Sequence, residues 1–264
     1  MLYDLSQLKN KTFSSVVDGA DAVLLDRFSR EKVQDILYIL SDGIALEKTA
    51  ELLCFLNPEL EILKLPAWDT VPYDRVSPNI NIVAQRIETL TSITLTPNPK
   101  KSRIILTSVG AVLQKLPPQK IFQNSIKQIK VGNKLSFNEF IHYVSINGYN
   151  RVEQVIEPGE YAVRGDIIDI FPVGTDEPLR IDLFDDEVER IRTFDAMTQR
   201  TNGELNHYTF QVMGEVALDE NTIKSFRTKY REAFGAAFKD DEIYADVSNG
   251  IKHLGMENWL PFFL

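Results

Sequence analysis

The chain has 264 residues, of which 44% are hydrophobic and 25% are charged, and its formal net charge at pH 7 is −9. A chain of this size and composition can bury one large hydrophobic core or two smaller ones, and it contains no apolar run near the roughly 18–20 residues of a membrane helix. The acidic charge argues against nucleic-acid binding as the main function, because clustered Lys and Arg side chains bind phosphate backbones.

The first 117 residues alternate between strand and helix signals. We predict strands over 34–40, 60–66 and 102–108 and helices over 43–55, 79–95 and 109–116. The runs at 34–40 and 102–108 are almost continuously apolar, which is typical of strands buried on both faces of a parallel sheet. The order of the elements therefore predicts an α/β domain with helices packed on a parallel sheet.

The pair Pro117-Pro118 interrupts this pattern and marks a predicted domain boundary. Residues 118–212 contain a strand, a helix and then several short alternating runs. Turn signals separate these runs at 158–159, 173–175 and 185–186, which predicts a small α+β domain with an antiparallel sheet. The last part of the chain, over 213–264, has a predicted strand over 215–218 and predicted helices over about 220–234 and 240–250.

The stretch LYILSDGIALEKTAELLCFL (37–56) places a Lys-Thr pair after a predicted strand and turn. A phosphate-binding loop follows the pattern G-x-x-x-x-G-K-[ST], in which backbone N–H groups wrap the phosphates. Here Asp42 and Glu47 replace the two glycines. Each carboxylate would cost roughly 4 kcal/mol per unit of phosphate charge at a separation near 4 Å. The sequence therefore predicts a P-loop-like domain without a functional P-loop and without a cofactor.

A helix that begins directly after Asp42 accounts for the same residues. Asp42 is a favourable N-cap, and we expect Glu47, Lys48 and Glu51 to form the solvated face of the helix. The predicted inward face, at helical spacing, consists of Leu46, Ala50 and Leu53.

Other residues with possible chemistry have simpler structural explanations. Asp166 and Asp169, and the cluster at 185–187, are acidic, but 185–186 lies between two alternating runs and predicts a hairpin turn rather than a metal site. The three histidines are far apart in the sequence and have no paired nucleophile. Cys54, the single cysteine, excludes an internal disulfide, suits a cytoplasmic protein and is predicted to be a small core residue.

The run RIDLF (180–184) has an unusual outward face. If 179–184 is a strand, Leu179, Ile181 and Leu183 face the core, and Arg180, Asp182 and Phe184 face the other side. An aromatic residue beside arginine on a solvent face is typical of protein–protein hot spots. We expect Arg164, on a strand beside this one, to extend that face. The alternative is that a helix of the domain covers Phe184 and that the arginines pair with Asp182 or Asp166.

Three stretches, LPAWDTVPYDRVSPN (65–79), GYNRVEQVIEPGEYAVRGDIIDIFP (148–172) and RIDLFDDEVERIRTFDAMTQRT (180–201), closely resemble the N-terminal region of bacterial transcription-repair coupling factors. That region is itself similar to the damage-recognition protein UvrB. The resemblance covers nearly the whole chain. It implies a UvrB-like α/β domain over 1–117 (domain 1a), an inserted domain over 118–212 (domain 2) and a returning segment over 213–264 (domain 1b).

The same resemblance implies a partner and the residues that bind it. In this family the inserted domain recruits UvrA, the excision-repair ATPase, through two arginines and one aromatic residue on exposed strands. Arg164 of AVRG matches the first arginine, and Arg180 and Phe184 of RIDLF match the second arginine and the aromatic residue. The apolar closing stretch, 255–264, leads us to expect a domain of a longer cytoplasmic protein.

The full-length family protein is an ATP-dependent DNA translocase that displaces stalled RNA polymerase, so ATP, Mg²⁺, DNA and the polymerase are expected to bind its other domains. UvrB carries a P-loop and an aromatic-rich hairpin that clamps damaged DNA. This sequence departs from UvrB at both places, which predicts an adaptor rather than an enzyme. Two alternatives remain: an intramolecular clamp that masks the UvrA-binding surface, and a residual nucleotide- or DNA-binding domain.

Overall fold

The computed structural model describes residues 12, 14–31, 33–97, 99–119, 123 and 126–264. These residues form two compact units. The first contains the described residues up to Ala67 together with Thr96–Gln114, and the second contains Trp68–Leu95 and the described residues from Lys115 to Leu264. In the described part of the chain, no helix is both long enough and apolar enough to cross a membrane.

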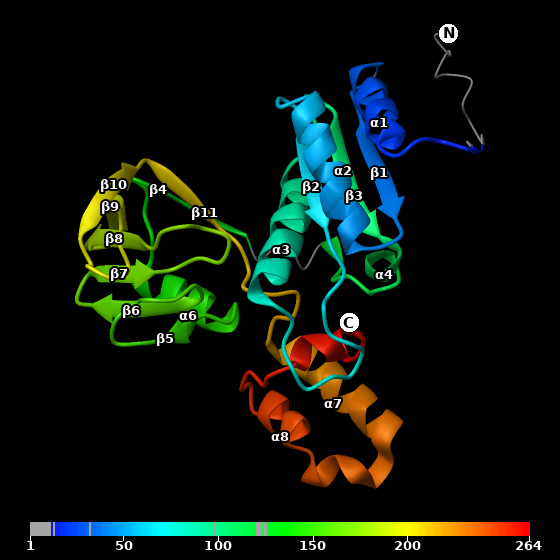
Figure 1. Cartoon of the computed structure of the whole chain (residues 1–264). Helices are drawn as coiled ribbons and strands as arrows, with labels where there is room; N and C mark the ends of the chain where they lie inside the picture. The colour runs from blue at the N-terminus through cyan, green and yellow to red at the C-terminus, as the bar shows by residue number, and fades with distance from the viewer. Residues whose placement is uncertain (1–11, 13, 32, 98, 120–122, 124–125) are drawn as a thin grey trace. The chain divides into compact units, whose positions relative to one another are not determined.

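The first unit is built on a three-stranded parallel sheet in the order β1-β3-β2 (Figure 1). Its strands are β1 (Asp35–Leu40), β2 (Glu61–Leu65) and β3 (Arg103–Ser108), and its helices are α1 (Ala20–Glu31), α2 (Gly43–Leu56) and α4 (Val109–Val112). Apolar side chains of α1 and α2 pack with those of the three strands in one hydrophobic cluster. The three strands and the helix predicted over 43–55 are confirmed, the helix predicted over 109–116 ends earlier, at Val112, and α1 was not predicted.

Strand β1 differs from its prediction. It lies at the edge of the sheet, and Leu37 and Ile39 on one of its faces are exposed. The central strand β3 is buried at every position. A continuous apolar run therefore did not distinguish an edge strand from a central one, because the order of the strands is set by long-range packing.

Helix α2 begins as its sequence predicts. The Asp42 carboxylate accepts a hydrogen bond of 2.9 Å from the backbone N–H of Ala45, which holds the pKa of this carboxyl below its usual value. Leu46, Ala50 and Leu53 are buried. The prediction that Cys54 is a core residue is wrong: its side chain is exposed, because it lies one position beyond the buried stripe of the helix.

The second unit contains a six-stranded sheet in the order β10-β9-β8-β7-β6-β5. Neighbouring strands are antiparallel except for the short β5–β6 pair, which is parallel. The strands are β5 (Asn150–Arg151), β6 (Glu160–Arg164), β7 (Ile167–Ile170), β8 (Leu179–Phe184), β9 (Glu187–Phe194) and β10 (Thr201–Leu205). The chain turns at 158–159, 173–174 and 185–186, as the turn signals predict, and also at 165–166 between β6 and β7, where no turn was predicted.

Helix α6 (Phe137–Ile146) and the two-stranded sheet of β4 (Lys127–Lys130) and β11 (His207–Phe210) complete the core on the inner face of this sheet. Phe140, Tyr143 and Val144 of α6 pack in one cluster with apolar residues of β6 to β9. The six-stranded sheet therefore has an inner face filled by apolar side chains and an outer face on the opposite side.

The rest of the second unit is helical. It contains α3 (Ile80–Leu95), α7 (Glu220–Phe234), η2 (Gly235–Asp240), α8 (Glu242–Ser248), η3 (Met256–Trp259) and α9 (Leu260–Phe263). The strand predicted over 215–218 is wrong. Glu215 instead forms a buried ion pair with Arg86 of α3, and Val216 and Leu218 pack against an aromatic cluster. A buried ion pair and apolar packing, rather than strand pairing, therefore hold this segment.

Candidate functional site

The outer face of the six-stranded sheet carries all three residues that the sequence selects. On β8, Leu179, Ile181 and Leu183 are buried in the inner core, as the alternation predicts. Phe184 points the other way and 71% of its side-chain surface is exposed. None of the described helices covers this ring, so the alternative in which Phe184 is sealed is wrong.

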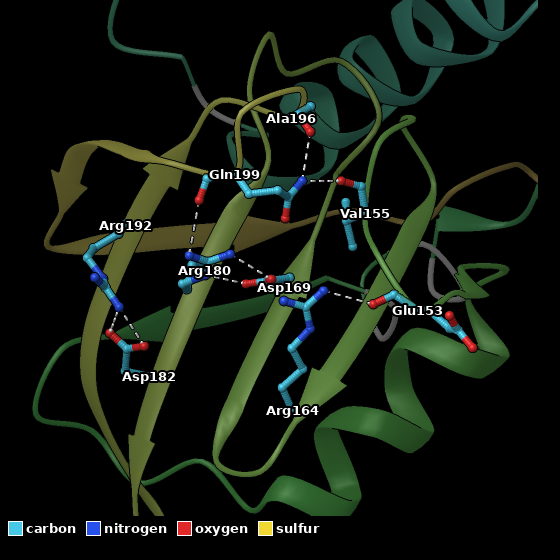
Figure 2. Close-up of polar contacts among 9 residues, drawn as sticks. All are labelled: Glu153, Val155, Arg164, Asp169, Arg180, Asp182, Arg192, Ala196 and Gln199. Atoms are coloured by element: carbon cyan, nitrogen blue, oxygen red, sulfur yellow. Dashed lines mark hydrogen bonds and ion pairs between the residues drawn. The ribbon is translucent and has the colours of Figure 1, made fainter.

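Arg164 lies at the end of β6, but the expectation that its strand neighbours β8 is wrong. Strand β7 lies between them, and the register aligns Arg164 with Ile167 and Ile167 with Asp182. The Arg164 side chain is exposed and its Nη2 donates a hydrogen bond of 3.0 Å to the carbonyl oxygen of Glu153 (Figure 2). This single bond to an exposed carbonyl leaves most of the guanidinium facing solvent.

Arg180 is held by its own domain, in contrast to the exposed cation that the sequence predicts. Its Nε and Nη2 atoms donate hydrogen bonds of 2.7 and 2.9 Å to the two carboxylate oxygens of Asp169, and only 17% of the Arg180 side chain is exposed. The guanidinium also lies 4.6 Å from the centre of the Phe194 ring. The hydrogen bonds to Asp169 raise the pKa of the Arg180 guanidinium.

The segment after β9 explains why Arg180 and Arg164 differ in exposure. Gln199 has a positive φ of 61°, and its Nε2 donates to the carbonyl oxygens of Val155 and Ala196 at 2.9 and 2.7 Å (Figure 2). Val155 and Ala196 pack with outer-face residues in a small apolar cluster. This cluster covers the part of the outer face that holds Arg180, whereas the part that holds Arg164 and Phe184 is open.

Two acidic residues of β8 and the turn after it, Asp182 and Asp185, have structural roles. Both oxygens of Asp182 accept from Arg192, at 2.8 and 2.5 Å. Asp185 has a positive φ of 52° and lies in the turn between β8 and β9, so the predicted hairpin turn is confirmed. Within the described ranges, no group of three or more His, Cys, Asp or Glu side chains is arranged to hold a metal ion.

Sequence reasoning missed Ile167, the residue between Arg164 and Asp182 in the register. Its side chain is 36% exposed on the outer face, while Ile168 beside it is fully buried. The signal was present in the doublet Ile167-Ile168, because strict alternation would place a polar residue at one of these positions.

A family model described as the UvrB interaction domain matches residues 128–213. The chain is 35% identical over 96% of its length to a transcription-repair-coupling factor from Haemophilus influenzae. It is 33% identical over 76% of its length to one from Escherichia coli and 33% identical over 90% to one from Rickettsia bellii. The matched regions make up 22%, 17% and 21% of these relatives, so the chain spans about a fifth of their length.

Proposed function

We propose that this chain, which matches the UvrB interaction domain over residues 128–213 and is similar along most of its length to transcription-repair-coupling factors, is an adaptor that recruits UvrA by protein–protein recognition. Recruitment to a transcription complex stalled at DNA damage would start excision repair there. The chemistry of the proposed step is association, with no bond made or broken in the partner.

The observation that carries this proposal is the exposed ring of Phe184 at the end of β8. A phenylalanine with most of its surface in water lowers the free energy of the complex when a partner covers it. Aromatic and arginine side chains dominate the energetics of such interfaces. Arg164, which is exposed on the same face, supplies charge-assisted hydrogen bonds to carboxylates or carbonyl groups of UvrA.

Arg180 has a more indirect role in this proposal. Two of its donor atoms are occupied by Asp169, and Nη1 lies 3.4 Å from the carbonyl oxygen of Gln199. Arg180 therefore binds UvrA through its remaining exposed edge, and it also fixes β7, β8 and the Gln199 segment relative to one another.

We predict that Arg164→Ala abolishes detectable capture of purified UvrA in a pull-down without changing the melting temperature of the chain. The side chain is exposed and makes one hydrogen bond to an exposed carbonyl, so its removal changes stability by less than about 0.5 kcal/mol. The matched control is Arg151→Ala. Arg151 is an exposed arginine on β5, and the register aligns it with Tyr161, whose side chain lies in the inner core, so Arg151 is not on the outer face. Equal capture by wild type and Arg164→Ala would remove the site assignment.

The proposal also assigns the larger architecture. Residues 1–117 form a UvrB-like domain of the P-loop type in which Asp42 caps α2 where a functional loop would have its first glycine. Residues 118–212 form the inserted UvrA-binding domain, and 213–264 return to complete the first. ATP hydrolysis, translocation on DNA and displacement of RNA polymerase belong, in this proposal, to other domains of a full-length protein.

A further inference from the structure

Four residues form a row across the open part of the outer face. The register pairs Arg164 of β6 with Ile167 of β7, Ile167 with Asp182 of β8, and Asp182 with Arg190 of β9. Residues that are directly opposite each other on neighbouring strands share a face. With adjacent strands about 4.8 Å apart, the row spans roughly 14 Å, which is the scale of the centre of a protein interface.

Ile167, within this row, and Phe184, beside it, form an apolar centre. Phe184 lies two residues beyond Asp182 on β8 and therefore on the same face, diagonal to Ile167. Between Arg164 and Ile167 the chain turns at Gly165 and Asp166. Gly165 has a positive φ of 62°, and a Cβ atom placed there would meet nothing within 4 Å, so a partner can approach the backbone beside both apolar side chains.

The two ends of the row are cationic and favour acidic groups on the partner, whereas the exposed Glu187 is aligned with Phe184 beside the apolar centre. Arg164 at one end of the row is exposed, and the Arg190 side chain at the other end is 59% exposed, with a loose contact of 3.8 Å to Glu189. The carboxylate in the middle of the row, Asp182, is already neutralised by Arg192. Carboxylates of the partner that face Arg164 and Arg190 would therefore be attracted to these cations without strong repulsion from Asp182.

We propose that Ile167 is a second apolar anchor of the UvrA-binding face. The matching surface of UvrA would then be an apolar depression that accepts Ile167 and Phe184 together. Carboxylates of UvrA would lie opposite Arg164 and Arg190. This inference rests on the proposed function. Ile167 is a contact residue for the partner, and its exposed surface is covered only in the complex.

The test measures the affinity of the 264-residue chain for purified UvrA in three variants. Ile167→Thr keeps the β-branched shape that suits a strand and replaces apolar surface with a hydroxyl, so we expect affinity to fall about tenfold. Ile167→Leu keeps the apolar surface and should bind within about twofold of wild type. Ile146→Thr is the matched control, because Ile146 is also an isoleucine with 37% exposure but lies on α6, on the inner side of the sheet.

Phe184→Ala in the same series separates the two proposals. If Phe184→Ala weakens binding but Ile167→Thr binds UvrA as wild type does, the role of Ile167 is wrong and the proposed function stands. If wild type shows no binding to UvrA, both are overturned. An equal loss in Ile146→Thr and Ile167→Thr would also contradict the role of Ile167, because the effect would not be confined to the outer face.

Discussion

Arg180 and Arg164 both lie on the outer face of the sheet, but removing each side chain has a different effect on buried charge. Arg180 neutralises Asp169, whose side chain is only 4% exposed, whereas Arg164 neutralises no buried charge. Removing one partner of a mostly buried ion pair leaves the other charge without compensation. A loss of UvrA binding in an Arg180 variant therefore does not by itself identify a contact residue.

We predict that Arg180→Ala lowers the free energy of unfolding by about 2–4 kcal/mol, while Arg164→Ala changes it by less than about 0.5 kcal/mol. Urea denaturation followed by circular dichroism measures both. The double variant Arg180→Ala with Asp169→Ala should recover part of the loss, because it removes the uncompensated carboxylate as well. Equal stability of Arg180→Ala and wild type would mean that the ion pair does not hold the sheet.

The alternation of β8 could be predicted from the sequence because it depends only on the geometry of one strand. Leu179, Ile181 and Leu183 were assigned to the core correctly, and so was the exposure of Phe184. The pairing of Arg180 with Asp169 could not be predicted with the same certainty. It depends on the register between β7 and β8, which the intervening loop and the whole sheet determine.

At the scale of elements, Asp241 connects three parts of the second unit. It accepts hydrogen bonds of 3.1 and 2.8 Å from Arg75, 2.7 Å from Tyr230 and 3.2 Å from the backbone N–H of Ile243 at the start of α8. Burial raises the pKa of Asp241, but these hydrogen bonds outweigh it, and the net pKa lies below the usual value. The ionised carboxylate is therefore the form that stabilises the fold.

The sign of the pH dependence follows from this direction. The unfolded chain binds a proton at Asp241 at higher pH than the folded chain does, so the stabilisation is fully present above the usual aspartate pKa of about 4 and is lost as pH falls through the lower folded value. We predict that Asp241→Asn is about 1–2 kcal/mol less stable at pH 7. Its stability should also fall less steeply than wild type below about pH 4.

Urea denaturation of the two proteins between pH 2.5 and pH 7 checks this prediction. The matched control is Asp246→Asn, because Asp246 lies on α8 and pairs with His253, whereas Arg75 pairs with Asp241. Parallel stability curves for wild type and Asp241→Asn across the acid range would contradict the assignment.

The start of helix α2 could be predicted from its sequence, but the exposure of its last turn could not. Its start at Gly43 and its cap at Asp42 followed from local chemistry and are confirmed. The exposure of Cys54 was not predicted, because its apolar neighbours Leu53 and Phe55 suggested that this part of the helix is buried. Phe55 itself is 83% exposed. The position of β1 at the sheet edge was missed for a related reason, since strand order arises from packing across the whole unit.

At the scale of the molecule, the net charge of −9 is combined with an outer face whose exposed row ends in arginines. The overall charge disfavours association with nucleic acid, while the local arginines favour an acidic protein surface. The combination of a parallel sheet with an antiparallel one, and most of the elements, followed from the sequence. The open part of the outer face did not, because it depends on how the Gln199 segment covers one part of the sheet and leaves the other uncovered.

The most direct test of the account is the affinity of the chain for purified UvrA, wild type against Phe184→Ala, by isothermal titration calorimetry. We predict that the variant loses about 2 kcal/mol or more of binding free energy, or about thirtyfold in Kd, with an unchanged melting temperature. Phe55→Ala is the control, because Phe55 is also highly exposed, at 83%, but lies in the first unit. Binding of Phe184→Ala that matches wild type would contradict the account.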